Sequence, residues 1–369
     1  MKRVLIVSVG NLSGGIERYT ILLGKMLSEN GYNVYYALRK NSWLSEQIIS
    51  DNVILLDMDK NHLFSSMFCL KRYVEEHKIN IIHCNSNNGL FVSLFARETK
   101  TRKKIGVIHG DVIVDQANKR KIVSKGYVFL ENLLLKRTCS MCIAVSKSIE
   151  EILVSRGIPR KKIEVVYTGI EFLEYNKLPE YFSDELKICS VGNLLPVKNH
   201  ISLLHSLLYL KKLHPEVKFS CDIYGDGGEK ETLLKFVEDN ELGNVNVKGF
   251  DLNIRSKLNQ YTLYIHPSLY ESFGLAILEA MNAGCCVIAN RVGGVQEIID
   301  DNSGYLIDIS DENGLAELIF SLYKNRTKMN EIAIAGKKRC KEEFSIDKMF
   351  ENIMHTYNAG LGENIEIKI

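Results

Sequence analysis

The sequence predicts an α/β protein made of two Rossmann-like domains, each built around a parallel β-sheet. Short apolar runs rich in valine and isoleucine alternate with segments of helical periodicity along the chain, which is typical of parallel α/β folds. With 369 residues, the chain is long enough for two separate hydrophobic cores. The polar, irregular segment 174–184 divides two such series, so we expect domains at 1–173 and 185–345 with a linker between them.

The strands expected in the first half are short, apolar and rich in β-branched residues. They are Val4–Val9, Val34–Leu38, Val53–Met58, Ile79–Cys84, Ile105–His109, Met141–Val145 and Ile163–Tyr167. Amphipathic helices are expected between most of them, for example at Ile16–Ser28, Leu63–His77 and Ile149–Ser155. Gly31 and Gly157 suit the ends of two helices, because glycine readily adopts the left-handed conformation found there.

A second series of strands follows the linker. Its expected members are Leu186–Val191, Val217–Tyr224, Val245–Lys248, Leu263–His266 and Cys286–Ala289. Helices are expected at Ile201–Leu213, Lys230–Asp239 and Glu312–Lys324. A last helix is expected from Ile346 to about Tyr357, at the start of the C-terminal segment 346–369. This segment could pack back on the N-terminal domain.

Composition favours a globular protein that does not cross a membrane. Mean hydropathy is −0.06, and no apolar run approaches the ~20 residues that a membrane helix needs. The N-terminus is typical of a first strand, because no small-residue cleavage site follows its short apolar run. Most of the nine cysteines lie in apolar strands, which favours reduced thiols and a cytoplasmic location. Cys139 and Cys142 form a lone CxxC, which is too little for a zinc site.

Charge is distributed unevenly between the two halves. Residues 1–173 carry 26 Lys and Arg against 16 Asp and Glu, a net charge of +10, and residues 174–369 carry 21 against 29, a net charge of −8. The basic residues gather at 100–104, 119–125 and 160–162. Such a half suits an anionic membrane surface or an acidic substrate, and a solvated basic face without a partner fits equally well. Nucleic acid is disfavoured, because no basic ribbon interleaved with aromatic residues is present.

One stretch of the second half carries the strongest functional pattern. The expected strand that ends at His266 is followed by a loop and a helix, with Ser272 as the expected N-cap and Gly284 just past the helix end. Such a unit presents free backbone N–H groups and the positive end of a helix dipole to a phosphate. Glu271 lies before the cap and Glu279 about two turns inside the helix, so both carboxylates can approach one extended ligand. Two solvated helix charges are the simpler alternative, which the apolar neighbours of both residues disfavour.

The string Glu271-Ser-Phe-Gly-Leu-Ala-Ile-Leu-Glu279 resembles the E-x7-E signature of retaining glycosyltransferases of the GT-B fold, in particular glycosyltransferase family 4. The resemblance covers nearly the whole chain and implies two domains facing across a cleft, with a nucleotide-sugar, most often UDP-linked, on the C-terminal one. It implies that Glu271 orients the donor sugar and that Glu279 accepts the ribose hydroxyls. The implied diphosphate contacts are backbone amides around Ser272, Phe273, Gly274 and Leu275.

The same resemblance implies the substrate class and the location. By analogy the acceptor is a glycan, lipid-linked, of a bacterial surface polysaccharide such as O-antigen, capsule or exopolysaccharide. The enzyme would then be cytoplasmic and peripheral at the inner face of the cell membrane. Three other classes stay open: a sugar-nucleotide epimerase of the same fold, a phosphorylase that needs pyridoxal phosphate, and a catalytically silent nucleotide-sugar-binding partner.

Two features of the first half fit the same family. The glycines of the loop Gly10-Asn-Leu-Ser-Gly14-Gly15-Ile-Glu17 let a ligand approach the backbone closely, although a simple tight turn is equally consistent. The loop is similar to the family's N-terminal loop, which implies that Gly14 and Gly15 line the acceptor site and that Gly15 also meets the donor. His109 ends a strand at the edge where α/β sheets bind ligands. It matches the family's histidine that reaches the donor sugar, and His83, at another strand end, is the competing candidate.

The rest of the expected donor site comes from the second half. Lys198 follows a glycine loop and offers a positive charge to a diphosphate, with a solvated turn lysine as the alternative. The family commonly has an arginine five residues before this lysine. Asn193 occupies that position instead, so one positive charge for the diphosphate is missing. The detailed phosphate contacts are therefore not predicted. Phe250 ends the strand whose backbone usually meets the nucleotide base in this family.

No metal or cofactor is expected. Asp57-Met58-Asp59 has the DxD spacing of metal-dependent glycosyltransferases of another architecture. Such pairs arise easily by chance, and this one falls at an expected strand end in a series that is already explained. Helix N–H groups and Lys198 could neutralise the diphosphate without a metal ion.

Overall fold

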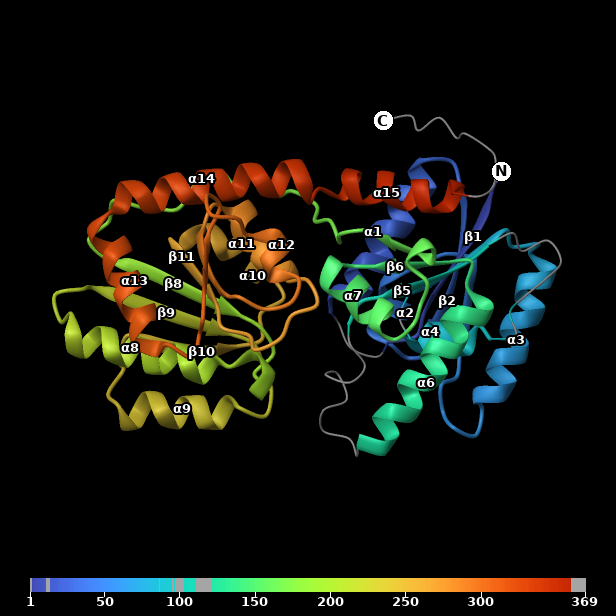
Figure 1. The fold of residues 1–369 in the computed structure, drawn as a ribbon, viewed down its shortest axis with the longest axis horizontal. Helices are drawn as coiled ribbons and strands as arrows, with labels where there is room; N and C mark the ends of the chain where they lie inside the picture. The colour runs from blue at the N-terminus through green and yellow to red at the C-terminus, as the bar shows by residue number, and fades with distance from the viewer. Residues whose placement is uncertain are drawn as a thin grey trace. The chain divides into compact units, whose positions relative to one another are not determined.

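The structure, a computed structural model, describes residues 2–10, 14–85, 87–94, 96, 103–110 and 121–359. The chain forms two compact units, one of residues 1–168 with 346–369 and the other of residues 169–345. The first unit is therefore discontinuous in sequence and is completed by the last helix of the chain (Figure 1).

A seven-stranded parallel sheet forms the centre of the first unit, with strand order β3-β2-β1-β4-β5-β6-β7 among its described residues. Its strands are β1 (Arg3–Ser8), β2 (Asn33–Arg39), β3 (Val53–Leu56), β4 (Ile81–Asn85), β5 (Lys103–Ile108), β6 (Met141–Ala144) and β7 (Ile163–Val165). Every residue of β4 and β5 is buried, as in parallel sheets covered on both faces. The strand order reverses at β1, so the carboxyl ends of β1 and β4 flank the topological switch point of this sheet.

The helices of the first unit include the last helix of the chain. They are α1 (Gly15–Glu29), α2 (Trp43–Gln47), α3 (Leu63–Glu76), α4 (Asn87–Val92), α6 (Lys121–Thr138), α7 (Lys147–Ser155) and α15 (Ile346–Asn358), with a short 3-10 turn, η1 (Arg160–Lys162). Side chains of β4 and β5 make polar contacts with α15 and the residue after it. The hydroxyl of Tyr357 lies 2.9 Å from Nδ1 of His83, and the ammonium of Lys103 donates to the carbonyls of Thr356, at 3.0 Å, and Ala359. No helix within the described residues is long and apolar enough to cross a bilayer.

Two lysines of the expected basic surface are buried. Lys103 and Lys104 are each 5% exposed, because both belong to the central strand β5. The Lys104 ammonium donates to the carbonyl of Ser93 at 2.6 Å, so its charge is met inside the protein. The prediction that the run 100–104 contributes a basic surface is therefore wrong for these two residues, and residues 100–102 lie outside the described residues. The side chains of 119–125 also lie outside them.

The second unit has a six-stranded parallel sheet with order β10-β9-β8-β11-β12-β13 among its described residues. The strands are β8 (Leu186–Val191), β9 (Phe219–Tyr224), β10 (Val245–Gly249), β11 (Leu263–His266), β12 (Cys286–Asn290) and β13 (Tyr305–Ile307). The helices are α8 (His200–Leu213), α9 (Lys230–Asp239), α10 (Ile254–Lys257), α11 (Leu275–Ala283), α12 (Val295–Ile298), α13 (Glu312–Lys324) and α14 (Arg326–Glu343), with 3-10 turns η2 (Pro196–Lys198) and η3 (Leu258–Gln260).

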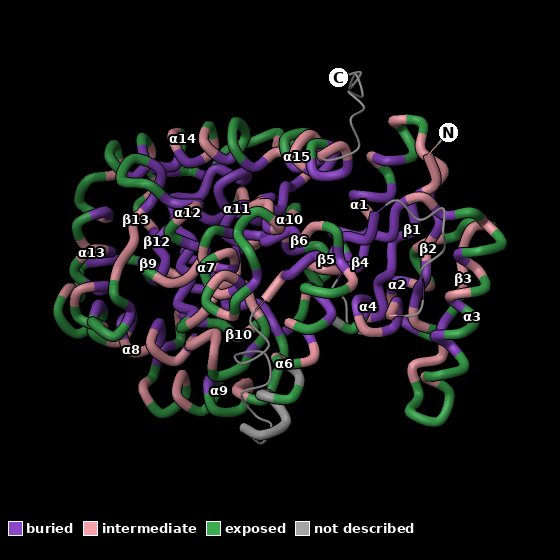
Figure 2. The backbone as a smooth tube through the Cα atoms, turned by 45° about the vertical axis from the view of Figure 1, so that its right-hand side comes forward, coloured by how far each residue is buried: buried purple, intermediate pink, exposed green. Residues whose placement is uncertain are grey.

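Each unit has a buried sheet between helical layers. In the second unit, α8 and α9 lie on one side of the sheet and α11 and α12 on the other (Figure 1). Figure 2 shows the strands of both sheets largely buried and the exposed residues concentrated on helices and loops. The two parallel sheets confirm the α/β fold class that the sequence predicts.

The segment 174–184 packs within the second unit instead of forming a linker. Tyr181 is 5% exposed and belongs to the core of that unit. The hydroxyl of Tyr175 donates to the carbonyl of Arg255 at 2.6 Å. The boundary between the units accordingly falls between residues 168 and 169. The segment is polar on average, but Tyr181 is buried in the core of the unit, which the average composition does not reveal.

Candidate functional site

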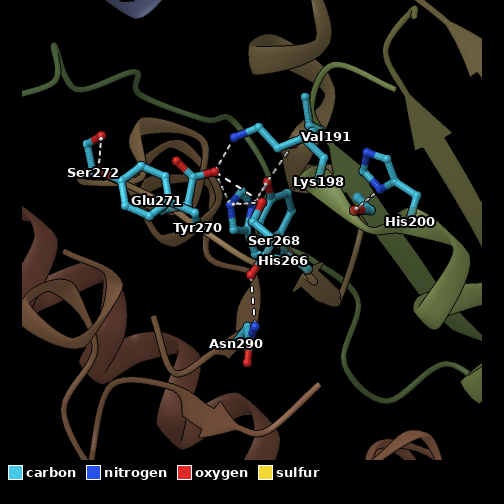
Figure 3. Close-up of polar contacts among 11 residues, drawn as sticks. Val191, Lys198, His200, His266, Ser268, Tyr270, Glu271, Ser272 and Asn290 are labelled. Carbon is cyan, nitrogen blue, oxygen red and sulfur yellow. Dashed lines mark hydrogen bonds and ion pairs between the residues drawn. The ribbon is translucent and has the colours of Figure 1, made fainter. Parts of the chain in front are cut away.

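The loop that joins β11 to α11 brings a carboxylate, an imidazole and an ammonium together (Figure 3). One oxygen of Glu271, Oε1, accepts from Nε2 of His266 at 2.7 Å, from the hydroxyl of Ser268 at 3.1 Å and from the ammonium of Lys198. Among the described residues, Oε2 of Glu271 has no hydrogen-bond partner. Oε1 therefore fixes the carboxylate in place, and Oε2 is left as an acceptor for a ligand.

Residues of neighbouring strands position His266 and Ser268, which in turn contact Glu271. Nδ1 of His266 lies 3.2 Å from the hydroxyl of Tyr264, and that hydroxyl donates to the carbonyl of Val191 at the end of β8. The amide of Asn290, on β12, donates to the carbonyl of Ser268 at 2.9 Å. Three adjacent strands thus set the positions of the imidazole and the serine, and the partners of a functional carboxylate are preorganised.

The environment keeps Glu271 ionised. Burial alone would raise the pKa of its carboxyl, but the hydrogen bond and charge of His266 and the Lys198 ammonium outweigh burial and lower the pKa to about 2. The carboxylate is therefore charged at neutral pH and can only accept hydrogen bonds. It can bind a ligand hydroxyl, but it is too weak a base to remove a proton.

Helix α11 begins at Leu275, and Gly274 is its N-cap residue, so the prediction that Ser272 caps this helix is wrong. Gly274 has φ +121°, a backbone conformation that residues other than glycine rarely adopt. The helical conformation therefore begins only after Gly274. The hydroxyl of Ser272 instead lies 3.5 Å from that of Tyr270. Gly284 follows the helix with φ +83°, in the left-handed conformation expected at this position.

A second glycine loop supports the Glu271 loop through its backbone. The N–H of Gly294 donates to the carbonyl of Glu271 at 3.1 Å. Gly293 has φ +46°, and a Cβ on it would lie only 2.0 Å from the same carbonyl oxygen. The Gly293–Gly294 pair is therefore required for the two loops to pack this closely.

The structure brings only some of the predicted donor residues into contact. Lys198, the last residue of η2, reaches Glu271, whereas Asn193 is exposed on the preceding loop. Phe250 is 61% exposed just after β10, three strands away from β11 in the sheet order. Phe273 is buried and packs edge-to-face on Phe344, with ring centroids 5.8 Å apart, so its side chain supports the loop.

Glu279 lies inside α11 and is 8% exposed. Burial chiefly, with smaller contributions from the charges of Glu271 and Glu279 among others, raises the pKa of Tyr264. Both carboxylates therefore act on the same buried phenol. The second carboxylate of the E-x7-E string therefore lies within electrostatic range of the same side chain as the first.

His109 follows β5, and Asn85 of β4 orients its ring. The amide nitrogen of Asn85 donates to the carbonyl of Ile16 at 3.0 Å and to the hydroxyl of Thr20, both on α1. The amide oxygen of Asn85 is therefore the atom that faces Nε2 of His109, and since this oxygen only accepts, Nε2 carries the proton. Burial lowers the pKa of His109 to about 4, so at neutral pH the ring is uncharged and Nδ1 is an acceptor.

His83, the competing candidate, is structural. Its ring is fully buried, with the hydroxyl of Tyr19 3.2 Å from Nε2 and that of Tyr357 2.9 Å from Nδ1. Both ring nitrogens are thus engaged within the first unit and none is left for a ligand. Burial, with a smaller effect of nearby His109, lowers the pKa of His83 to about 3 and keeps the ring neutral.

The glycine loop of the first unit leads directly into α1. Gly14 is the N-cap residue with an extended backbone, and Gly15 is the first helical residue. Glu17 is buried, and burial raises its pKa, although hydrogen bonds from backbone N–H groups partly oppose the rise. A Cβ on Gly10 would come within 2.1 Å of the Glu17 carboxylate, so Gly10 makes room for this side chain. Residues 11–13 lie outside the described residues.

Two other sequence patterns have structural explanations. Asp57 and Asp59 each accept a backbone N–H from their own loop at 3.0 Å. Cys139 and Cys142 are buried free thiols, and burial raises the pKa of Cys142 to about 12, so it is protonated at neutral pH. Among the described residues, no cluster of three His, Cys, Asp or Glu side chains could hold a metal ion.

No role for His266, Ser268 or Asn85 is evident from the sequence alone. The position of His266 at a strand end, five residues before Glu271, is a signal that could have marked it. Asn85 also ends a strand, but its partners come from α1 and from the end of β5, and nothing local in the sequence indicates that pairing.

Comparison with known families accounts for both halves of the chain. Residues 174–339 match the family model "Glycosyl transferases group 1", and residues 13–172 match "Glycosyltransferase Family 4". With two parallel-sheet units, the chain is a glycosyltransferase of the GT-B fold. It belongs to the family 4 type, as the residues of the E-x7-E string suggested.

Individual relatives cover most of the chain. The poly(ribitol-phosphate) alpha-N-acetylglucosaminyltransferase of Staphylococcus aureus (strain COL) is 25% identical over 93% of this chain and 72% of that protein. The UDP-Gal:alpha-D-GlcNAc-diphosphoundecaprenol alpha-1,3-galactosyltransferase of Escherichia coli is 23% identical over 79% of this chain and 78% of that protein. Anabaena HepE, crystallised with UDP-glucose, matches with a TM-score of 0.82 and 19% identity over 97% of this chain and 100% of that chain, which shows a common fold.

Proposed function

We propose that this chain transfers a hexose or an N-acetylhexosamine from a UDP-sugar to a lipid-linked glycan of a bacterial surface polysaccharide, with retention of the anomeric configuration. The observation that carries the proposal is the Glu271 arrangement before α11, inside the region that matches the group 1 family model. The names of the relatives support the substrate class. One acts on a ribitol-phosphate polymer and another on a sugar linked to diphosphoundecaprenol.

The donor diphosphate binds at the start of α11 in this proposal. No acceptor for the N–H groups of Leu275 and Ala276 is found among the described residues, and the helix dipole adds partial positive charge there. The ammonium of Lys198 has three N–H donors and gives only one to Glu271, so two remain for phosphate oxygens. Glu279 accepts the ribose hydroxyls. These groups stabilise the negative charge that grows on the diphosphate as it leaves.

Oε2 of Glu271 accepts a hydrogen bond from a hydroxyl of the donor sugar. The family resemblance gives Nδ1 of His109, an acceptor at neutral pH, the same role. In the transfer step, the bond from the anomeric carbon to the diphosphate oxygen breaks, and a bond to the acceptor oxygen forms on the same face. The acceptor hydroxyl proton passes to the leaving phosphate, so no covalent enzyme intermediate is required.

A donor panel followed by product analysis tests this function. The purified protein is titrated with UDP, UDP-glucose, UDP-galactose and UDP-N-acetylglucosamine, and the donor that binds is incubated with a lipid-linked sugar acceptor. We expect transfer, and we expect nuclear magnetic resonance to show an α-linked product from an α-linked donor. A β-linked product would exclude retention. Conversion of the donor to its epimer without acceptor would indicate the epimerase, and binding without turnover the silent partner.

We further propose that the first unit attaches peripherally to the inner face of the cell membrane. Lys136 and Arg137 lie in the last turn of α6, and the same stretch of sequence carries four more basic residues: Lys119, Arg120, Lys121 and Lys125. Each basic residue near an anionic bilayer contributes about 1 kcal/mol, so several together suffice for reversible attachment. Co-sedimentation with anionic and neutral vesicles is the test. Binding that ignores vesicle charge or high salt would contradict the mechanism.

A further inference from the structure

The first unit contains a pocket at the topological switch point of its sheet. Its volume is about 340 Å³, within the ~300–1,000 Å³ range of small-molecule sites. Val9 and Arg39 bring the carboxyl ends of β1 and β2 into its wall, and Asn88 and Phe91 bring α4, which follows β4. In open parallel sheets this is the place where ligands bind.

Most of the pocket wall is apolar. The apolar lining residues are Val9, Met58, Leu63, Phe91, Leu130 and Leu134. Among the described residues that line the pocket, Asn88 is the one neutral polar side chain. A sugar or a polyol would lose water from several hydroxyls here and regain few hydrogen bonds, which is unfavourable. A hydrocarbon chain has no such requirement.

The remaining lining residues give the pocket a positive charge. Arg39 and Lys60 have no ion-pair partner in the part of the chain that the structure describes. Glu131 also lines the pocket, but its carboxylate pairs with Arg156 at 2.8 Å, so that charge is balanced. The two cations match the charge of a phosphate group.

The two helices that contribute Leu63 and Leu130 also carry exposed aromatic side chains. Phe64, next to Leu63 on α3, is 67% exposed, and Phe129, next to Leu130 on α6, is 71% exposed. Exposed aromatic side chains on these helices favour contact of this part of the unit with an apolar partner.

We infer that this pocket binds the lipid-phosphate end of the acceptor, a phosphate group attached to a hydrocarbon chain. The inference rests on the proposed function and deepens it by naming the residues that bind the lipid phosphate of the acceptor. Arg39 and Lys60 bind the phosphate, and the apolar wall receives the first part of the chain. A polyol-phosphate acceptor, whose phosphates carry hydroxyl-rich groups, does not match this wall.

Equilibrium binding of farnesyl phosphate to the full chain tests the inference without any turnover. The ligand is kept below its micelle concentration, and the variants Arg39→Gln, Lys60→Gln and Leu63→Ser are compared with the wild type. Lys161→Gln is the matched control, because Lys161 is an exposed lysine of the same unit that does not line the pocket. UDP binding is measured in parallel on every variant.

We expect each cation variant to bind farnesyl phosphate about tenfold more weakly, the loss of one charge-assisted contact, while Lys161→Gln binds as the wild type does. Leu63→Ser should weaken farnesyl phosphate but leave UDP binding intact. Unchanged affinity in both cation variants, or displacement of farnesyl phosphate by glycerol 3-phosphate at equal concentration, would overturn the inference. Failure of the wild type to bind UDP would instead overturn the proposed function, so the two failures are distinguishable.

Discussion

Replacing Lys198 by methionine separates two roles of its ammonium. Methionine keeps an apolar side chain of similar length but removes the charge, so Glu271 loses one of three donors to Oε1. The two side chains are 23% and 13% exposed. The loss of stability on breaking an ion pair is about 0–1 kcal/mol for an exposed pair and about 3–5 kcal/mol for a buried one, and this pair lies between these limits. We expect the free energy of unfolding to fall by about 1–3 kcal/mol and the pKa of Glu271 to rise toward its ordinary range.

The double variant Lys198→Met with Glu271→Gln distinguishes the roles. It removes the unpaired carboxylate charge and should regain most of the lost stability, measured by chemical denaturation. If Lys198 also binds the diphosphate, the affinity for UDP stays about 10- to 100-fold low, because a charge-assisted hydrogen bond contributes about 1.5–3 kcal/mol. Uridine, which has no phosphate, is the matched ligand and should bind each variant alike. A folded Lys198→Met variant with wild-type affinity for UDP would refute the diphosphate role.

Three further predictions follow from the same structure. Glu279→Ala should weaken UDP binding by about 1.5–3 kcal/mol in calorimetry, whereas unchanged affinity would remove Glu279 from the ribose site. Transfer should survive EDTA; complete loss that Mn²⁺ restores would revive Asp57 and Asp59 as metal ligands. Burial holds the pKa of His83 near 3 and that of His109 near 4, so the unfolded chain binds more protons below pH 6.5. Stability should therefore fall between pH 6.5 and about 4, by up to about 1.4 kcal/mol per pH unit for each histidine, and a flat melting profile would contradict this.

Hydrophobic periodicity predicts most of this fold. The strands Leu186–Val191 and Leu263–His266 and the helices Lys230–Asp239 and Glu312–Lys324 have the expected bounds. Helical periodicity does not predict α14, because most of its residues are charged or polar and only a narrow apolar stripe packs on α11. Lysines 103 and 104 illustrate the opposite error. A basic run suggests a surface, but both ammonium groups donate to carbonyl groups inside the unit, and the acceptor for Lys103, Thr356, is 253 residues away in sequence.

The candidate site could be predicted only where its signal is local. The spacing of Glu271 and Glu279 is visible in the chain, as is the glycine at the end of α11. The start of that helix could not be deduced from capping preference, because the N-cap is Gly274, whose backbone conformation suits glycine, and not Ser272 two residues earlier. The structural role of His83 depends on Tyr357, which lies 274 residues away, and no local pattern indicates such a pair.

The discontinuity of the first unit has a consequence for the order in which the protein folds during synthesis. Residues 169–345, the whole second unit, are translated before α15. At ~5–20 residues per second, a ribosome needs roughly 10–35 s to add them. Throughout that interval, the face of the nascent first unit that α15 will cover, including the ring of His83, is open to water. The second unit, continuous in sequence, can finish folding first, the reverse of the N-terminal-first order of contiguous domains.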